Sequence, residues 1–468
     1  MATTPARRPT GDGAPPGPAP AALPDFPAAP PAAPPRARWW RRRRVTIGAG
    51  AGVLALCGTV LLALVREETG TPGFLVGLAL AVLPVPPLLA AFHWLNRVAP
   101  RPWRDTAFCF AWGSCAAALI SIVANSYAVH WIADETADPD GADTLGATVI
   151  APVVEESAKA AAILLVFVFH RRGLTRLLDG VVVAGVTATG FAFVENVLYL
   201  GTAFDTDRTS GDTGLASLTL MTFLVRVVLS PFAHPLFTVV TGLGFGLAAQ
   251  LPPRQRVRRA LAPAVGLLLA MGLHALWNGS TTFGDAGFFL VYGLFMVPVF
   301  GVVTWWTLRT RQRELKVLRE VLPDYVAAGW LAFPEPFALG SLRARTLALD
   351  HARHHGGAPL RRTVRAYQDD ATALALLRHR GARGAAGPDF LARERRLLDA
   401  LWERRHAVRP SLVHGALLTA PWSVLPPPAY GYGARFPHGH PGDGPPSPGA
   451  PVPAPGTALG RPAEGQQG

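Results

Sequence analysis

The fold of this chain is decided by the stretch Ala151-Pro152-Val153-Val154-Glu155-Glu156-Ser157-Ala158-Lys159-Ala160. Here two adjacent carboxylates and an amine lie inside an apolar run, residues 145–169, that is long enough to cross a bilayer. Each ionisable side chain near the middle of a bilayer costs about 2.5 to 3.5 kcal/mol, so such residues usually face a protein interior and carry its function. The run therefore predicts a membrane protein with a polar site inside the membrane.

The composition supports a membrane protein. Of the 468 residues, 50% are hydrophobic and only 16% are charged, which is too apolar for a soluble protein of this size. The net charge of +13 comes mainly from basic residues in loops and in the C-terminal region, without a stripe of stacking aromatics, so the predicted partner is the lipid bilayer and not nucleic acid. Three cysteines inside apolar segments predict packing rather than a disulfide framework: Cys57, Cys109 and Cys115.

We expect an all-α fold, a polytopic membrane helix bundle of about eight transmembrane helices with a small helical cytoplasmic C-terminal region. Each predicted span approaches the roughly 20 residues that a helix needs to cross hydrocarbon. The sixth is longer, and Pro231 within it predicts a bent or partly re-entrant element, because proline removes a backbone hydrogen bond. The predicted spans are about 45–65, 73–95, 106–133, 145–169, 178–201, 215–249, 258–279 and 286–308.

The loops predict the orientation. Basic residues follow spans two, four, six and eight, whereas acidic residues dominate the loops after spans one, three and five. Because basic loops stay on the cytoplasmic side, we expect a multi-pass protein of the cell membrane with both termini in the cytoplasm. The basic loops are 97–104, 171–176, 254–259 and 309–313.

Four regions follow from these spans. We expect a transmembrane domain that carries the functional site at 39–310 and a cytoplasmic helical region at 311–425, flanked by two disordered tails. The helical region is predicted to consist of short amphipathic helices with arginine-rich outer faces. The tails are 1–38, rich in Pro and Ala, and 426–468, rich in Pro and Gly; the predicted apolar faces are Leu360, Val364, Tyr367, Ala371 and Leu374, and Leu391, Leu398 and Leu401.

Polar side chains on spans four to seven are predicted to meet in the outer half of the membrane. Glu155 lies roughly 15 Å below the outer surface at 1.5 Å per residue. Lys159 follows the two glutamates by four and three residues, within reach of either across one helical turn. The other members are Glu195 on span five, Arg226 and His234 on span six, and His274 and Asn278 on one face of span seven.

This set suits hydrolysis of a peptide bond, which needs a base for water, a donor for the oxyanion and a hydrated cavity. We predict that Glu155 or Glu156, with His234, activates water, and that His274 and Asn278 hold the water or donate to the oxyanion. Lys159 and Arg226 are expected to be charge partners. Alternatively, zinc is held by ligands drawn from Glu155, Glu156, Glu195, His234 and His274, although the chain has no HExxH motif.

Four motifs resemble the PrsW family of intramembrane proteases, which are related to the CAAX prenyl endopeptidases and their bacterial CPBP relatives. The resemblance covers about residues 45–310. It implies that Glu155 and Glu156 are the catalytic acids and His234 their partner, with support from Glu195, His274 and Asn278. The motifs are Glu155-Glu156-x-x-Lys159, Phe191-x-x-x-Glu195-Asn196, Pro231-Phe232-Ala233-His234 and His274-x-x-x-Asn278.

The resemblance also implies a membrane-anchored protein substrate and regulated intramembrane proteolysis, for example of an anti-sigma factor. The CAAX and CPBP relatives carry a histidine where this chain has Glu195. Two alternatives remain: an ion- or proton-coupled transporter, because intramembrane ionisable residues also build ion pathways, and a non-enzymatic membrane scaffold. Against a transporter, the spans show no inverted repeat, since the internal charge lies almost entirely on spans four to seven.

Overall fold

The computed structural model describes residues 37–169 and 174–419, and all regular structure in these ranges is helical. The predicted tails lie almost wholly outside these ranges, as does part of the basic loop 171–176. The chain divides into a small unit, residues 1–51, and a large unit, residues 52–468, and the description below concerns the large one.

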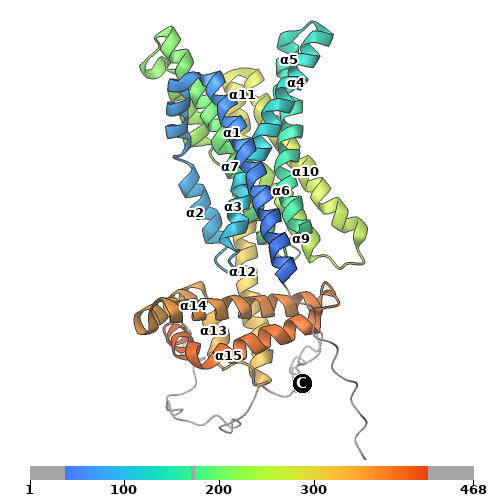
Figure 1. The fold of residues 1–468 in the computed structure, drawn as a ribbon, viewed down its shortest axis with the longest axis vertical. Helices are drawn as coiled ribbons and strands as arrows, with labels where there is room; N and C mark the ends of the chain where they lie inside the picture. Colours follow the sequence, from blue (N-terminus) through green and yellow to red (C-terminus); the bar gives the residue numbers. More distant parts are fainter. Residues whose placement is uncertain (1–36, 170–173, 420–468) are drawn as a thin grey trace, which may run out of the picture. The chain divides into compact units, whose positions relative to one another are not determined.

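The membrane part of the chain is built from helices that correspond to the predicted spans (Figure 1). Several are interrupted by short π-helical or 3₁₀ segments, written η, which locally change the pitch of the helix. They are α1 (Ala37–Ala81), α2 (Val85–Leu95), α3 (Trp103–Ala111), η1 (Trp112–Ala117), α4 (Ala118–Thr136), α5 (Pro139–Leu145), η2 (Gly146–Ile150), α6 (Ala151–Phe169), α7 (Leu177–Ser210), η3 (Gly214–Ala216), α8 (Leu218–Phe223), η4 (Leu224–Leu229), α9 (Ala233–Gln250), α10 (Arg256–Gly279), η5 (Ser280–Phe283), α11 (Gly284–Val291) and η6 (Tyr292–Met296).

Six helical segments in the described ranges are long and apolar enough to cross a membrane. The first joins two predicted spans, because the helical stretch continues through Gly70, whose φ of 66° marks a sharp kink. The run 145–169 is not among the six, since three charged residues interrupt it. The all-helical membrane fold is confirmed, whereas the count of eight stays a prediction. The six are Ile47–Leu95, Trp103–Thr136, Leu177–Ser210, Leu218–Gln250, Arg256–Phe283 and Ala286–Ala327.

Helix α7 is the centre of the membrane part, and 94% of its most apolar window is buried. Small residues let its backbone touch those of neighbouring helices, which is how membrane helices pack without a hydrophobic force between them. A Cβ atom on Gly180 would lie 2.0 Å from the carbonyl oxygen of Gly242 on α9, and one on Gly190 would lie 2.3 Å from that of Phe110 on α3. The glycines of α7 thus allow α9 and α3 to pack closely against it, and this packing sets the position of the helix that carries Glu195.

The predicted bend in the sixth span is confirmed. Helix α8 passes into the π-helical turn η4, the helix stops at Ser230, and α9 begins at Ala233 beyond Pro231. Arg226 and His234, which are eight residues apart, therefore do not lie on one continuous helix. Arg226 and His234 nevertheless both face the carboxylate of Glu195, because the helix break changes the direction of the chain between them.

The C-terminal helices are longer than predicted. Helix α12 runs without a break through the expected boundary at 310, so one helix joins the membrane part to a bundle with its own apolar core (Figure 1). Val364, Tyr367, Ala371 and Leu374 are fully buried there, as their spacing predicts, whereas Leu391 is 73% exposed and its predicted burial was wrong. The helices are α12 (Val297–Ala327), α13 (Glu335–Leu339), α14 (Leu342–Ala382) and α15 (Phe390–Leu417).

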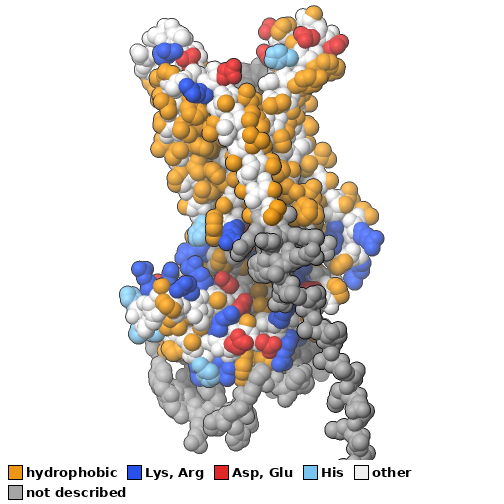
Figure 2. Space-filling model, in the orientation of Figure 1, with side chains coloured by type: hydrophobic (Ala, Val, Ile, Leu, Met, Phe, Trp, Pro, Cys, Tyr) orange, Lys and Arg blue, Asp and Glu red, His pale blue; other side chains and the backbone are white. Residues whose placement is uncertain are grey.

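Figure 2 shows how the side chains divide between these two parts. Apolar side chains cover the outside of the membrane helices, many of them exposed, such as Trp131, Leu268 and Phe295. Lys and Arg gather at the level where α12 enters the bundle. An apolar belt beside a basic border is the pattern expected of a protein in a bilayer.

Candidate active site

Glu156 is the most completely bonded carboxylate of the site. Its side chain is fully buried on α6, and Oε1 accepts a hydrogen bond from Lys159 Nζ at 2.9 Å. Nδ1 of His274 lies 3.2 Å from the same oxygen, and the Thr238 hydroxyl donates to Oε2 at 2.8 Å. With both oxygens engaged by three helices, Glu156 is held as an acceptor and has little capacity left for a water molecule.

Glu155 is different. Among the described residues, its hydrogen bond comes from Lys159 Nζ, which lies 3.3 Å from Oε2. Nε2 of His274 is 3.8 Å from the same oxygen, too far for a direct hydrogen bond. Glu155 retains slight exposure, at 6%, whereas Glu156 has none. Of the two carboxylates, Glu155 is therefore the one that has room for another group.

Lys159 joins the helices at the centre of the site. Its side chain is fully buried, and besides the two glutamates its Nζ lies 3.2 Å from Nδ1 of His234 on α9. The ammonium also stands 3.8 Å from the centre of the Phe191 ring on α7. Because an ammonium only donates, Nδ1 of His234 must accept, and the proton of this imidazole is on Nε2.

A second carboxylate lies close to Nε2 of His234. Nε2 of His234 lies 2.5 Å from Oε2 of Glu195, which also pairs with the Arg226 guanidinium at 2.6 Å. Arg226 in turn donates from Nε to Oδ1 of Asn196 at 2.9 Å and stacks on the Tyr199 ring at 4.0 Å. The side chain of His234 is thus oriented from one side by Glu195 and from the other by Lys159.

His274 has the same kind of support. The interaction of its Nδ1 with Glu156 leaves Nε2 directed at Glu155, and the ring stacks on Phe237 with centroids 4.9 Å apart. Asn278, one turn further along α10, does not reach the carboxylates. Its Nδ2 donates to the carbonyl oxygen of Ala147 at 2.8 Å, outside the buried cluster.

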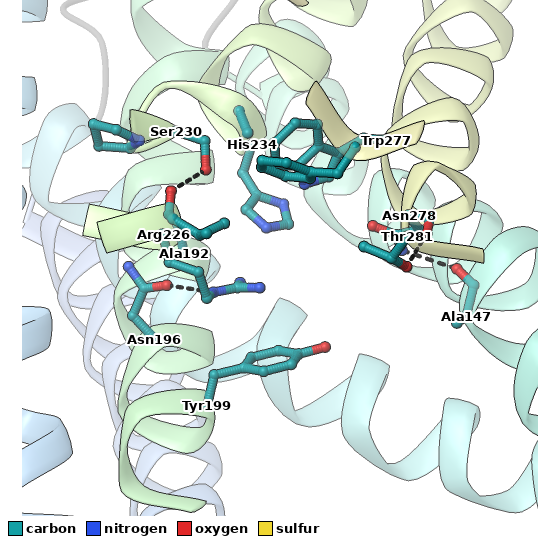
Figure 3. A pocket seen from close by; sticks show the side chains of 14 residues that line it. Ala147, Ala192, Asn196, Tyr199, Arg226, Ser230, His234, Trp277, Asn278 and Thr281 are labelled. Atoms are coloured by element: carbon teal, nitrogen blue, oxygen red, sulfur yellow. Dashed lines mark hydrogen bonds between the residues drawn. The ribbon is translucent and has the colours of Figure 1, made fainter. Parts of the chain in front are cut away.

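A cavity of about 240 Å³ leads to this cluster (Figure 3). His234 projects into it, and the lining includes Arg226, Asn278 and the aromatic rings of Tyr199 and Trp277. The glutamates and Lys159 lie behind its wall. His234 and Arg226 are therefore the members of the network that the cavity reaches directly, and Pro231 at the helix break is also part of the lining.

The structure thus brings seven of the eight predicted residues into one connected network and leaves Asn278 at its edge. Sequence reasoning missed three contributors. Thr238 completes the bonding of Glu156, Phe237 supports His274, and Trp112 donates from Nε1 to the carbonyl oxygen of Ala158 at 3.0 Å, which anchors α6 beside Lys159. The spacing of four residues between His234 and Thr238 was the one available signal, because it places both on one face of α9.

Three of these residues could also hold a metal ion. Glu155, His234 and His274 each offer one ligand atom, and these atoms lie within 4.8 Å of one another. Two histidines and a glutamate form a known ligand set of catalytic zinc, and each histidine here is oriented through its other nitrogen by a carboxylate, as zinc-binding histidines usually are. The donor set therefore fits zinc. Among the described residues, the Lys159 ammonium is the positive charge that contacts both Glu155 and His234.

Comparison with known proteins finds one family that matches the region of the site. Residues 101–303, which hold every residue of the network, match the family described as PrsW family intramembrane metalloprotease. Comparisons with curated proteins and with solved structures find no match. The match confirms the resemblance that the four motifs indicate, and it shows that residues 101–303 are similar to the PrsW family of intramembrane proteases.

Proposed function

We propose that the protein hydrolyses a peptide bond of a membrane-anchored protein, with Glu155 as the base that activates water. The observation that supports this proposal is the contrast between the two glutamates, because Glu156 has three hydrogen-bond partners whereas Glu155 has one among the described residues. Glu155 also lies within 4.8 Å of His234, the residue that meets the cavity. One water molecule can bridge two polar groups at that separation.

In this mechanism each side chain has a separate task. Glu155 takes a proton from the water and later delivers it to the leaving amine, the usual work of a general base and acid. His234 borders the water site at the end of the cavity, while Glu156 and Glu195 orient the two histidines. Lys159 and Arg226 place positive charge beside the position where the oxyanion forms, which stabilises the transition state most strongly in surroundings that exclude bulk water.

If zinc is bound, the residues that hold it are Glu155, His234 and His274, and the metal supplies Lewis acidity and lowers the pKa of a bound water. Glu156 then orients His274, and Glu195 orients His234, as in the carboxylate–histidine pairs around other zinc sites. Under both versions the same three helices, α6, α9 and α10, provide the groups that act on water.

The setting of the reaction is part of the proposal. The basic loops favour a multi-pass protein of the cell membrane with both termini in the cytoplasm, which puts the cavity toward the extracytoplasmic side. The family match favours a protease over a transporter or a scaffold. Regulated proteolysis of a membrane-anchored signalling factor, such as an anti-sigma factor, is the role that fits this position.

The test is to reconstitute the purified protein with single-span substrates and to compare it with Glu155→Gln, Glu156→Gln and His234→Ala. We expect Glu155→Gln to reduce cleavage by about 10²- to 10⁴-fold, the usual contribution of general acid–base catalysis. Glu67→Gln, at an exposed glutamate, is the matched control and should cleave normally. Full activity in all three site variants would refute the site, and loss on chelation with recovery on adding zinc would assign the metal version.

A further inference from the structure

A second cavity lies away from the protease site, on the proposed cytoplasmic side. It has a volume of about 230 Å³ and opens between the loops that precede α3 and α7 and the facing surfaces of α14 and α15. Its charged lining is unusual for a junction between two helical parts, since four arginines and three aspartates converge on it. They are Arg101, Arg176, Arg380, Arg393, Asp105, Asp179 and Asp369.

The three aspartates are already matched by cations. Each has an arginine partner, so the carboxylates are not available to neutralise the remaining positive charge of the lining. The pairs are Arg101 with Asp105 at 2.9 Å, Arg176 with Asp179 at 2.6 Å, and Arg345 with Asp369 at 3.8 Å.

Arg380 has no such partner within the described part of the chain. Its Nη2 donates to the carbonyl oxygen of Ala385 at 3.3 Å, while its Nε is buried without an acceptor. Arg393 forms only a long ion pair, with its Nε 4.0 Å from Oδ2 of Asp389. Burial, together with the charges of Arg393 and Arg259, lowers the pKa of Arg380. Asp179 and Asp389 act on Arg380 only from beyond ion-pair distance, so the cavity carries a half-buried guanidinium without an ion pair among the described residues.

We propose that this cavity binds the phosphate group of an anionic ligand, through Arg380 and Arg393 on one wall and Arg101 on the other. A guanidinium matches phosphate oxygens with two parallel hydrogen bonds, which is why arginine dominates phosphate sites. The basic loops at this level also lie where headgroups of anionic lipids concentrate. The phosphate comes either from a phospholipid headgroup of the inner leaflet or from a soluble phosphate compound.

Such a ligand joins the two parts of the protein. Arg101 belongs to the membrane part, whereas Arg380 and Arg393 belong to the C-terminal bundle, so one bound phosphate ties the bundle to the loops beneath the protease domain. A direct contact already exists nearby, since Arg176 pairs with Glu314 of α12 at 2.8 Å. The ligand strengthens this junction, and the inference does not depend on the proteolytic activity.

The test measures binding to the full-length protein, with two probes. The first is incorporation into phosphatidylcholine vesicles with or without phosphatidylglycerol, and the second is pyrophosphate added to protein in neutral detergent. Thermal unfolding reports ligand protection in each case. Arg380→Gln is compared with Arg353→Gln, an exposed arginine of the same helix α14. Because Arg380 forms no ion pair, the Arg380→Gln variant should be at least as stable as the wild type in the absence of a ligand. Arg380→Lys is a further variant that keeps the positive charge.

We expect protection of the wild type and of Arg353→Gln by at least one probe, and binding about tenfold weaker or worse in Arg380→Gln, as for loss of a charged hydrogen bond. Arg380→Lys should fall between them, because it keeps the charge but loses the paired hydrogen bonds. Protection by phosphatidylglycerol alone identifies a lipid headgroup, and protection by pyrophosphate identifies a soluble ligand. Absence of protection by either probe, or equal binding by the Gln variants at 380 and 353, overturns the proposal.

Discussion

The membrane site and the C-terminal bundle both bury carboxylates, but they neutralise them in different ways. In the membrane, Glu156 is bonded to the Lys159 ammonium. In the bundle, the buried Glu335 accepts a hydrogen bond from the Tyr367 hydroxyl. A tyrosine hydroxyl is neutral and cannot balance a carboxylate charge, so Glu156 and Glu335 favour different protonation states. The membrane site is built to keep charges in place, whereas the bundle tolerates a carboxyl group that takes up a proton.

The two regions also differ in what holds their helices together. The bundle packs large apolar side chains around Tyr325 and Tyr367, and the hydrophobic effect stabilises it in water. The membrane part brings backbones together at glycines, for example Gly180 against Gly242. In the membrane part, ion pairs between helices therefore contribute much to which helices pack together. Substitutions of charged residues should therefore have their largest effects there.

The largest effect is expected for Lys159→Met. This change leaves two glutamates buried without their shared cation, and removal of one partner from a buried ion pair costs about 3 to 5 kcal/mol. Unfolding of the purified protein measures the loss. Lys316→Met is the control, since Lys316 pairs with Glu320 on the surface of α12, where an ion pair contributes about 1 kcal/mol or less. Adding Glu156→Gln to Lys159→Met should recover part of the stability. Equal effects at the two lysines would contradict the comparison.

A somewhat smaller effect is expected from pH in the bundle. Burial raises the pKa of Glu335 from its ordinary value of 4.5 to about 7. Because the folded protein holds this proton more tightly than the unfolded chain, the contribution to stability is complete below pH 4.5 and is lost as the pH rises to 7. The difference is up to about 3 kcal/mol.

Denaturant unfolding followed by the fluorescence of Trp330 and Trp402, both in the bundle, measures this dependence. Glu335→Gln cannot ionise and should unfold with a flatter pH profile across the same range. An unchanged slope in that variant would show that another group is responsible.

A third prediction concerns the orientation of His234. Glu195→Gln keeps the shape of the side chain but removes the charge that faces Nε2 of His234 and Arg226. Loss of such a supporting carboxylate typically reduces activity by about 10- to 100-fold, so cleavage should fall by this factor while the melting temperature changes little. Asp205→Asn, at a more exposed position of α7, should retain activity. Normal cleavage by Glu195→Gln would mean that Lys159 alone orients the histidine.

Much of this organisation could be predicted from local sequence. The spacing of Glu155, Glu156 and Lys159 predicts their contacts, because residues three and four apart are neighbours on any helix. Pro231 predicts the bend, and the spacing from Val364 to Leu374 predicts the buried face of α14. Each of these features depends on one helix and its own periodicity.

Features that depend on packing between distant segments could not be predicted in this way. The two glutamates are equivalent in sequence, and only the arrival of Thr238 and His274 from other helices distinguishes Glu156. Leu391 fits the apolar pattern of α15 but finds no neighbour to bury it. The cavity at Arg380 forms from segments that are far apart in the sequence, such as those of Arg101 and Arg380, so neither composition nor periodicity indicates it.

The smallest effect is expected at Asn278, where sequence and geometry disagree. Its spacing from His274 predicts a donor to the oxyanion, and removal of such a donor would reduce cleavage by about 10²- to 10³-fold. In the structure its amide instead bonds to the carbonyl oxygen of Ala147 at the cavity lining, a neutral hydrogen bond that contributes about 1 kcal/mol. Asn278→Ala should therefore lower cleavage less than tenfold, far less than His234→Ala in the same assay. A loss as large as that of His234→Ala would show that Asn278 turns inward when a substrate is bound, because only then can its amide reach the reacting carbonyl.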